Sequence, residues 1–528
     1  MTTSVVSTEE VRAALIAREE IALLDVREED PFAQSHPLWA ANLPLSKLEL
    51  EAWGRIPRRD TRIVVYDDGE GLTERAAARL RALGYTDVNS LDGGLAGWRE
   101  AGGELFRDVN VPSKSFGELV ESKRHTPSLS AQDVQALLAA KADVVVLDAR
   151  RFDEYQTMNI PGSTSVPGGE LVLRARELAP DPATRVIVNC AGRTRSIIGT
   201  QSLVNASLPN PVAALRNGTI GWTLAGQSLE HGASRRFDPA IRPEHLEAAR
   251  GAAADVARRA GVSVIGATTL AQWLAEPRRT TYRFDVRTPE EYAAGHRAGF
   301  RSAPGGQLVQ ETDVHAPVRG ARIVLSDDDG VRASMAASWL AQMGWDVAVL
   351  DAPPPQGDAL ETGPDKAPQP APPAVRSVTP ATLADWLATG DAIVVDVTLS
   401  ANYVKRHVPG AAYALRSQLP ELLPQLGNPR RLVLTCGSSL LARFAAEDIQ
   451  ALTASEVLVL EGGTAAWVAA GLPVEAGETR LLSPRIDRYR RPYEGTDNAA
   501  SAMQAYLDWE FGLVEQLGRD GTHHFFVV

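Results

Sequence analysis

A cysteine followed by a glycine and two arginines is the pattern in this chain best suited to nucleophilic chemistry. It lies in residues 186–199, VIVNCAGRTRSIIG, and Cys190 is one of only two cysteines among 528 residues. The β-formers before Cys190 predict a strand, and the apolar stretch beginning near Ser196 predicts a helix. Cys190 is therefore expected in a short turn that joins a strand to a helix.

The turn after Cys190 has the residues needed to hold an anion at the sulfur. Gly192 permits backbone angles that other residues avoid, and such a turn can direct successive N–H groups inward. The next helix adds its positive N-terminal end, and Arg193 and Arg195 add full charges. We therefore predict a lowered pKa for Cys190 and a nucleophilic sulfur at neutral pH.

The alternative role for Cys190 is that of a small buried apolar residue, which is the commoner role of a lone cysteine at a strand end. A glycine and two arginines lie within five residues of it. Those neighbours would serve little purpose around an apolar filler, so they favour the reactive role.

The strand, turn and second strand around Cys190 are one of four copies in the chain. In each copy a helix-like stretch leads into an apolar strand that ends in aspartate, and a second apolar strand follows. The strand-end aspartates are Asp25, Asp148, Asp285 and Asp396, and the residues after the second strands are Asp67, Cys190, Asp327 and Cys436. Their separations of 42, 42, 42 and 40 residues identify an internal repeat.

A third strand and a glycine turn close three of the four copies. Each glycine stands four residues before a tryptophan, and the pairs are Gly94 and Trp98, Gly218 and Trp222, and Gly463 and Trp467. The third copy ends VAVLDAPPPQG and lacks this element. We expect the tryptophans to pack in the core beneath the turn rather than to contact a ligand.

Strands that alternate with helices predict an α/β protein of four tandem domains, each a parallel sheet with helices on both faces. In such sheets the functional site lies beyond the carboxyl ends of the strands, where Cys190 and Cys436 fall. The predicted divisions are repeat 1 (1–110), repeat 2 (111–235), repeat 3 (236–352), a Pro-rich linker (353–376), repeat 4 (377–480) and a tail (481–528).

Three connecting segments have recognisable patterns of their own. Residues 106–126 join the first two repeats, and residues 236–262 include a helix-like spacer. The Pro-rich linker is expected to be extended or mobile. The tail contains NAASAMQAYLDWEFGLVEQL, an amphipathic pattern that predicts a helix packed back on the body.

Composition restricts the classes of partner and compartment. Apolar residues make up 44% and charged residues 23%, and the formal net charge is −12 with no basic stripe. We therefore expect no nucleic acid and no membrane as a partner. No signal peptide, transmembrane segment, metal motif or cofactor motif is recognised. Two cysteines in different sequence contexts do not form a disulfide framework, which favours a cytoplasmic protein.

The repeat and its cysteine turn resemble the rhodanese sulfurtransferase family over residues ~5–478. The resemblance depends on LLDVREED, VLDARRFDEY and FDVRTPEEY, on NIPGSTSVP and HVPGAAY, on CAGRTRS, and on LDGGLAGW, LRNGTIGW and LEGGTAAW. The family implies four rhodanese-type domains and a double displacement. A cysteine takes a sulfane sulfur from a donor such as thiosulfate or a low-molecular-weight persulfide. It then passes that sulfur to cyanide, to a thiol or to a protein acceptor.

The resemblance also assigns roles to residues of this chain. Cys190 would carry the persulfide, and Arg193 and Arg195 would bind an anionic donor. Cys436, in TCGSSLLARF, is similar to the cysteine of mercaptopyruvate-using members and is a second catalytic candidate. Leu440 and Leu441 depart from that pattern, so a packing or regulatory role is its alternative. The amides that would cradle the persulfide are those of Ala191, Gly192, Arg193, Thr194, Arg195 and Ser196.

Repeats 1 and 3 have Asp67 and Asp327 in place of the cysteine and are predicted to be inactive in sulfur transfer. Their acidic turns, YDDGEGLTER and SDDDGVRAS, are expected to be solvated, with cation binding as the alternative. Inactive repeats leave open a non-catalytic scaffold, or a sulfur carrier or regulatory module, as a different function for the whole chain.

Other cysteine chemistries fit this sequence less well. His36, His296 and His407 occupy matching positions in repeats 1, 3 and 4, but repeat 2 has Asn159 there, which weakens a Cys–His hydrolase. A cysteine phosphatase needs arginine at the sixth position after the cysteine, and here that residue is Ser196. Arsenate reduction meets the same geometric objection.

Overall fold

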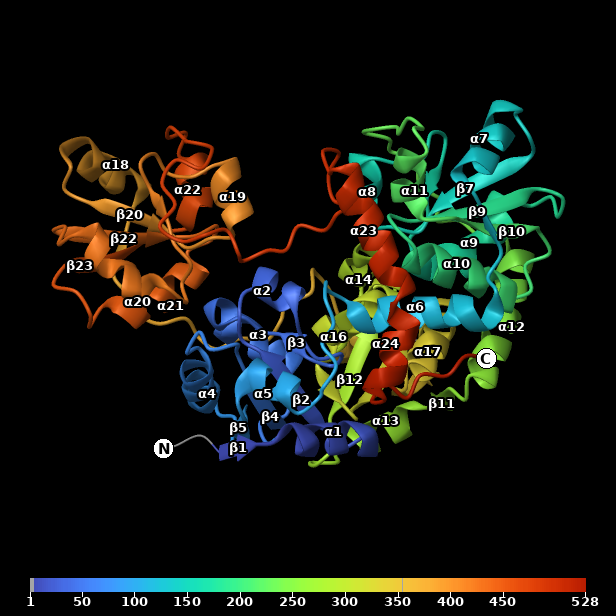
Figure 1. Ribbon diagram of the computed structural model, residues 1–528, viewed down its shortest axis with the longest axis horizontal. Coiled ribbons are helices and arrows are strands. Elements are labelled where there is room, and N and C mark those ends of the chain that lie inside the picture. Colours follow the sequence, from blue (N-terminus) through green and yellow to red (C-terminus); the bar gives the residue numbers. More distant parts are fainter. Residues whose placement is uncertain (1–3, 354) are drawn as a thin grey trace.

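The computed structural model describes residues 4–353 and 355–528 and contains a parallel sheet with flanking helices in each of the four repeats (Figure 1). All four strand-end aspartates close a strand, and Asp67, Cys190, Asp327 and Cys436 each follow a central strand. The predicted α/β fold of tandem parallel sheets is therefore confirmed.

Repeat 1 has the strand order β1-β5-β4-β2-β3. Ser7 and Glu10 form a capping box at its first helix. Its elements are β1 (Ser4–Val6), α1 (Thr8–Ala17), β2 (Ile21–Asp25), α2 (Glu29–Gln34), β3 (Ala41–Asn42), η1 (Leu45–Lys47), α3 (Leu48–Arg55), β4 (Arg62–Tyr66), α4 (Thr73–Ala82), β5 (Val88–Leu91) and α5 (Gly94–Glu100).

Repeat 2 has the equivalent order β6-β10-β9-β7-β8, so the strand that precedes Cys190 lies in the middle of the sheet. Its elements are α6 (Val111–Arg124), β6 (Ser128–Leu129), α7 (Ala131–Ala139), β7 (Val144–Asp148), α8 (Phe152–Thr157), β8 (Thr164–Ser165), η2 (Gly168–Glu170), α9 (Leu171–Leu178), β9 (Arg185–Asn189), α10 (Thr194–Asn205), β10 (Val212–Leu215) and α11 (Gly218–Leu224).

Repeat 3 begins with the predicted spacer helix, and its sheet has the order β11-β17-β16-β12-β14. One of its strands, β15, pairs antiparallel with β2 of repeat 1. Its elements are α12 (Pro243–Arg259), β11 (Ser263–Ile265), α13 (Ala267–Leu274), β12 (Thr281–Asp285), α14 (Pro289–Ala294), β13 (His296–Arg297), β14 (Arg301–Ser302), α15 (Gly305–Gln310), α16 (Thr312–His315), β15 (Val318–Arg319), β16 (Arg322–Ser326), α17 (Arg332–Gln342) and β17 (Asp346–Leu350).

The linker, repeat 4 and the tail complete the chain. The linker contains η3 (Gly357–Ala359) and β18 (Leu360–Glu361), and β18 pairs with β13. The sheet of repeat 4 has the strand order β19-β23-β22-β20-β21. The elements of repeat 4 are β19 (Ser377–Val378), α18 (Pro380–Thr389), β20 (Ile393–Asp396), α19 (Ser400–Lys405), β21 (Ala412–Tyr413), α20 (Leu419–Leu422), η4 (Leu423–Leu426), β22 (Arg431–Thr435), α21 (Leu440–Ile449), β23 (Glu456–Leu460) and α22 (Gly463–Ala469). The tail contains α23 (Ala500–Phe511) and α24 (Leu513–Asp520).

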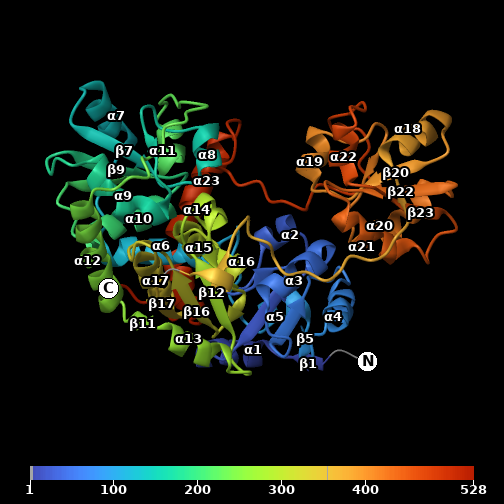
Figure 2. The same cartoon turned by 180° about the vertical axis from the view of Figure 1, so that it is seen from behind.

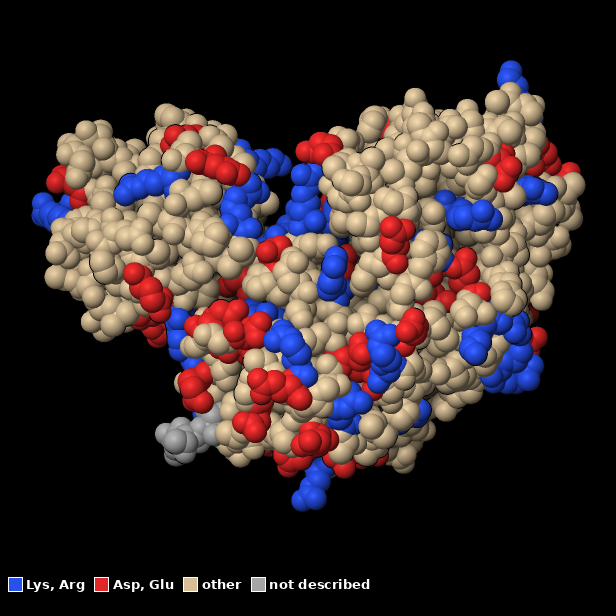
Figure 3. Space-filling view, in the orientation of Figure 1, with Lys and Arg blue, Asp and Glu red and all other residues tan. Residues whose placement is uncertain are grey.

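The repeats pack into a three-repeat body and a smaller lobe formed by repeat 4 (Figure 2). Repeats 1 and 3 share one apolar core, whereas repeat 4 has cores of its own. The lobe contacts repeat 1 through Arg416, which lies 2.6 and 2.9 Å from the carboxylate oxygens of Glu49. Figure 3 shows acidic and basic side chains interspersed over one face of the three-repeat body and the repeat 4 lobe.

The segment that joins repeats 1 and 2 is more ordered than its sequence indicates. It forms α6, most of whose residues are buried. The tail crosses from the repeat 4 lobe to the body, and both of its helices lie against α6 (Figure 1). The predicted packing of the tail on the body is thus confirmed. The tryptophans Trp98, Trp222 and Trp467 are buried, as predicted.

None of the helices within residues 4–353 and 355–528 is both long and apolar enough to cross a bilayer.

Candidate functional site

Cys190 follows β9 directly, and α10 begins at Thr194, two residues earlier than expected. The strand-end aspartate of the neighbouring β7 fixes this junction. The Asp148 carboxylate accepts hydrogen bonds from Arg150 at 2.9 and 2.8 Å and from Asn189, the residue before Cys190, at 2.8 Å. Asp25 and Asp285 bind Arg27 and Arg287 in the same way, so these aspartates position the loops rather than react.

The Cys190 sulfur is buried at the floor of the loop formed by residues 190–196, the Cys190 loop. Its side chain is 1% exposed, and its S–H donates to Ser196 Oγ at 3.4 Å. Burial raises the pKa of Cys190, while Arg195 and the hydroxyl and backbone N–H of Ser196 oppose that shift. The prediction of a lowered pKa is therefore wrong, because burial outweighs the positive charge near the sulfur.

Carboxylates inside the chain already bind both arginines of the loop. Arg193 contacts Glu118 at 2.7 and 2.8 Å and also pairs with Glu121, both on α6. Arg195 contacts Glu154 on α8 at 2.7 and 2.9 Å. Arg193 and Arg195, which the sequence predicts to bind an anionic donor, thus have guanidinium groups paired with carboxylates that hold the loop to α6 and α8.

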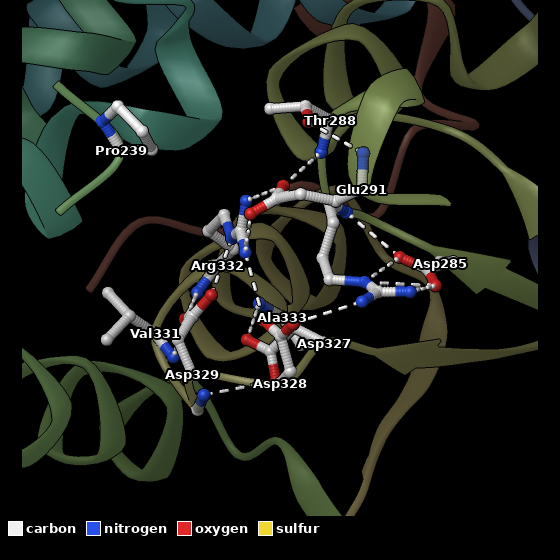
Figure 4. A network of polar contacts seen from close by, with 12 residues as sticks. Pro239, Asp285, Thr288, Glu291, Asp327, Asp328, Asp329, Val331, Arg332 and Ala333 are labelled. Atoms are coloured by element: carbon white, nitrogen blue, oxygen red, sulfur yellow. Dashed lines mark hydrogen bonds and ion pairs between the residues drawn. The ribbon is translucent and has the colours of Figure 1, made fainter. Parts of the chain in front are cut away.

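Repeat 3 contains the counterpart of the Arg195–Glu154 pair without a cysteine (Figure 4). Arg332, five residues after Asp327, lies 2.6 Å from Glu291 and 2.5 Å from Asp329. It also lies 2.9 Å from Glu170 of repeat 2. Because the pair occurs where no nucleophile exists, its shared role is to maintain the shape of the loop.

The loops of repeats 1 and 3 use their backbone N–H groups to bind a carboxylate. Asp67 accepts from the amides of Gly69 at 3.1 Å, Leu72 at 2.5 Å and Thr73 at 3.0 Å. Asp327 accepts from Gly330 and Ala333 at 3.1 and 2.9 Å. Residues 68–71 are exposed, as expected for a solvated turn, whereas Asp67 itself is buried among inward-directed amides.

The two cysteines share these amide positions to different extents. The backbone N–H groups of Ser438, Leu441 and Ala442 oppose the rise in the pKa of Cys436, and they stand at the same offsets as the three amides around Asp67. At Cys190 the amide of Ser196 occupies the last of these offsets. The loop after the central strand therefore directs two or three N–H groups at this atom in repeats 1, 3 and 4, and the N–H of Ser196 at Cys190 in repeat 2.

The Cys436 loop, residues 436–442, is the more open of the two cysteine loops. Gly437 and Ser438 are exposed, although burial raises the pKa of Cys436 itself. The strand-end aspartate of repeat 4 has Thr398 where the other repeats have arginine, and burial raises the pKa of Asp396 to about 7. The Cys436 site therefore has amide donors and access to solvent.

The tail closes the Cys190 loop from outside, which the sequence did not indicate. Gly192 does not have a positive φ, so the predicted conformational reason for glycine is wrong. A Cβ atom at Gly192 would lie 3.1 Å from the Tyr506 ring and 3.4 Å from Glu510 Oε2. A side chain at this position would instead crowd α23, which packs against Gly192. The apolar contact between the tail and repeat 2 is made by Ala191, Ile220, Tyr493, Met503, Tyr506 and Leu507.

The three histidines considered from the sequence have structural roles. His36, His296 and His407 are buried and stack on Phe32, Tyr292 and Tyr403, with ring centroids 4.0, 3.6 and 3.8 Å apart. Asn159, at the matching position of repeat 2, donates to the Tyr155 carbonyl at 3.2 Å. These contacts supply no general base to Cys190.

A mostly apolar cavity of about 640 Å³ lies behind the Cys190 loop, between repeats 2 and 3. Thr194 and Arg195 line it on one side, and Gly305 and Trp339 line it on the other. Cys190 is not part of its lining.

Gly218 at the start of α11 supports the floor of the Cys190 loop. It has φ +54°, and a Cβ atom there would lie 2.3 Å from the Cys190 carbonyl oxygen. We predict that Gly218→Ala destabilises the protein by about 2–4 kcal/mol, from left-handed strain plus overpacking. Urea unfolding measures this effect. Gly226→Ala is the matched control, because Gly226 has φ +74° and no neighbour within 4 Å. Equal losses in the two variants would contradict the contact.

Comparisons with known proteins agree with this architecture. The family model described as "Rhodanese-like domain" matches residues 7–101, 130–225, 267–352 and 379–470. A solved structure described as a thiosulfate sulfurtransferase from Pseudomonas aeruginosa is 69% identical, with a TM-score of 0.98. That match covers 99% of this chain and 100% of the other.

Two curated relatives match over shorter stretches. The Pseudomonas aeruginosa protein named "Probable 3-mercaptopyruvate sulfurtransferase" is 51% identical over 139 residues, covering 25% of this chain and 47% of that protein. SseB of Mycobacterium tuberculosis is 30% identical over 125 residues, covering 22% of this chain and 43% of that protein. This chain thus spans less than half the length of either curated relative.

Proposed function

This chain belongs to the rhodanese family of sulfurtransferases, and we propose that it moves a sulfane sulfur through a persulfide on Cys190. The donor is an anion such as thiosulfate or a low-molecular-weight persulfide, and the acceptor is cyanide, a small thiol or a protein thiol. The match to a thiosulfate sulfurtransferase structure along 99% of the chain supports this class of reaction.

The proposed reaction has two balanced displacements. The Cys190 thiolate attacks the sulfane sulfur of thiosulfate, a new S–S bond forms, and the donor S–S bond breaks with its electron pair leaving on sulfite. Cyanide or a thiolate then attacks the terminal sulfur of the persulfide, and the departing electron pair restores the Cys190 thiolate. Cys190 begins and ends in the same state, so the cycle needs no cofactor.

The observation that carries the proposal is the carboxylate held by loop amides in repeats 1 and 3. Three N–H groups bind Asp67 and two bind Asp327. Where cysteine replaces aspartate, the same loop can stabilise a thiolate or a terminal persulfide sulfur, and it is already organised before the reaction. The proposed cradle in repeat 2 comprises the amides of residues 191–196, with Arg193 and Arg195 fixing the shape of the loop.

Cys436 is proposed as a second site for sulfur transfer. Three amides around its sulfur and an exposed loop support that assignment. Because its loop is open, Cys436 is suited to bulkier acceptors, including a protein thiol, than the covered Cys190 loop.

The test offers purified full-length protein three substrates in parallel. Thiosulfate with cyanide is expected to give thiocyanate with turnover, while an aryl phosphate and arsenate are expected to remain unchanged. Turnover of the aryl phosphate or of arsenate without thiocyanate formation would replace the proposal with phosphatase or reductase chemistry. No turnover with thiosulfate, persulfide or mercaptopyruvate would favour the scaffold function.

A further inference from the structure

The tail helix α23 places one buried acid next to Gly192 of the Cys190 loop. Glu510 is fully buried, and its Oε2 lies 3.4 Å from the position that a Gly192 Cβ would occupy. Oε1 accepts a hydrogen bond from the Tyr506 hydroxyl at 2.9 Å. Oε2 has no hydrogen-bond partner among the described residues. An unpartnered oxygen in a buried carboxyl group is unfavourable unless a ligand uses it.

We propose that Glu510 is a catalytic residue of the Cys190 site, a neutral acid that donates a hydrogen bond from Oε2 to an oxyanion of the sulfur donor. The inference deepens the proposed function and depends on it. The donor class is a sulfane sulfur bonded to a sulfonate group, as in thiosulfate.

The positive groups near the loop are already paired, which leaves recognition of the donor to hydrogen-bond donors. Carboxylates of Glu118, Glu121 and Glu154 hold the two loop arginines. The third nearby cation, Lys114 on α6, lies 2.7 Å from Asp108. The O–H of a neutral Glu510 is therefore a donor that remains available at the tail side of the loop.

The position of Glu510 excludes the role of direct base for the cysteine. The Cys190 sulfur makes its side-chain hydrogen bond to Ser196, and no such bond to Glu510 occurs among the described residues. In the proposed complex, the reacting sulfur and its oxyanion would lie between these two buried groups. Because Tyr506 donates to Oε1, the proton of the neutral acid resides on Oε2, which faces the loop.

The surroundings of Glu510 keep it protonated at neutral pH. Burial raises the pKa of Glu510 to about 8, and the Glu118 carboxylate on α6 adds to that effect. The groups that oppose it are Lys114 on α6, the Tyr506 hydroxyl on α23 and Arg193 of the loop. Cys190 also responds to the charge of Glu510, because an ionised Glu510 raises the pKa of Cys190 further.

The pH profile of donor cleavage follows from these two groups. The reaction needs the Cys190 thiolate, whose raised pKa makes the rate increase with pH. It also needs protonated Glu510, which is lost above pH 8. The rate of sulfite release from thiosulfate in wild-type protein should therefore increase up to about pH 8 and then level off.

The decisive experiment measures sulfite release across pH 6–10 in wild-type protein, Glu510→Gln, Glu510→Ala and Asp508→Asn. The Gln variant keeps an N–H donor but cannot ionise, so its rate is expected to continue increasing above pH 8. Glu510→Ala removes the donor and should lower the rate by about tenfold or more. Asp508 lies on the same helix but is exposed, so Asp508→Asn should match wild-type protein.

Two further readouts separate the possible failures. Alkylation of Cys190 by neutral iodoacetamide at pH 7 should differ by less than about twofold between wild-type protein and Glu510→Gln, which shows that the tail still covers the loop. A Gln variant that levels off at pH 8 like wild-type protein, or an Ala variant with an unchanged rate, overturns the role of Glu510. Absence of sulfite release from wild-type protein with every donor overturns the proposed function itself.

Discussion

Cys190→Ser is expected to lower thiosulfate-to-cyanide sulfur transfer by at least about 10³-fold, because the covalent carrier of sulfur is lost. A serine hydroxyl in the same buried loop does not ionise near neutral pH and cannot form a persulfide. The loop itself should persist, since β9, α10 and the Arg193 and Arg195 ion pairs do not depend on the sulfur. Steady-state thiocyanate formation at pH 8 gives the rate.

Cys436→Ser is the matched control for this prediction. It removes the other cysteine from an equivalent loop, which we assign to bulkier acceptors, and should keep nearly all of the thiosulfate-to-cyanide activity. Comparable unfolding midpoints of the two variants show that neither fold is lost. If the Cys436 variant is inactive while Cys190→Ser retains its rate, then repeat 4 is the working site and the assignment to Cys190 is wrong.

Arg193→Met is expected to destabilise the protein by about 3–5 kcal/mol, because it leaves the buried carboxylate of Glu118 without its partner. The Arg193 and Glu118 side chains are each 4% exposed. The substitution also removes the hydrogen bond to Asn217 at 3.1 Å and the contact with the Phe511 ring at 4.2 Å. Urea unfolding measured by circular dichroism gives the free energy of unfolding.

Two comparison variants test this explanation. Arg151→Met removes an arginine whose side chain is 55% exposed, and it should cost less than about 1 kcal/mol. The double variant Arg193→Met/Glu118→Gln removes both charges and should recover about 1–3 kcal/mol of the loss. Strictly additive losses would show that Arg193 stabilises the loop without its carboxylate partners.

The sequence was sufficient to predict the features that repeat at a fixed interval. Aspartates about 42 residues before the loop position mark the strand ends, and the Gly218 and Trp222 pattern marks the last helix of repeat 2. These features depend on residue patterns within one segment and on their repetition along the chain, and both can be recognised in the sequence alone. The position of Cys190 beyond a central strand follows from them.

The features that could not be predicted depend on contacts between distant segments. Arg193 pairs with Glu118, which lies 75 residues earlier in the chain on α6. The sequence of α6 indicated only a segment that joins repeats 1 and 2. Glu510 lies in a tail whose pattern indicated packing without indicating where. The raised pKa of Cys190 has burial as its largest cause, and that burial depends on tertiary packing. The sequence signal that could have indicated Glu510 is its place four residues after Tyr506, on the same face of the predicted tail helix.

The central claim is that Cys190 carries sulfane sulfur, and intact-protein mass spectrometry tests it most directly. Wild-type protein incubated with thiosulfate and no acceptor is predicted to gain the mass of one sulfur atom, mapped by peptide analysis to Cys190 and removed by cyanide. The Cys436→Ser variant should show the same gain, and the Cys190→Ser variant should lack it at residue 190. A wild-type protein that never gains sulfur at Cys190 with thiosulfate or a persulfide would contradict the account.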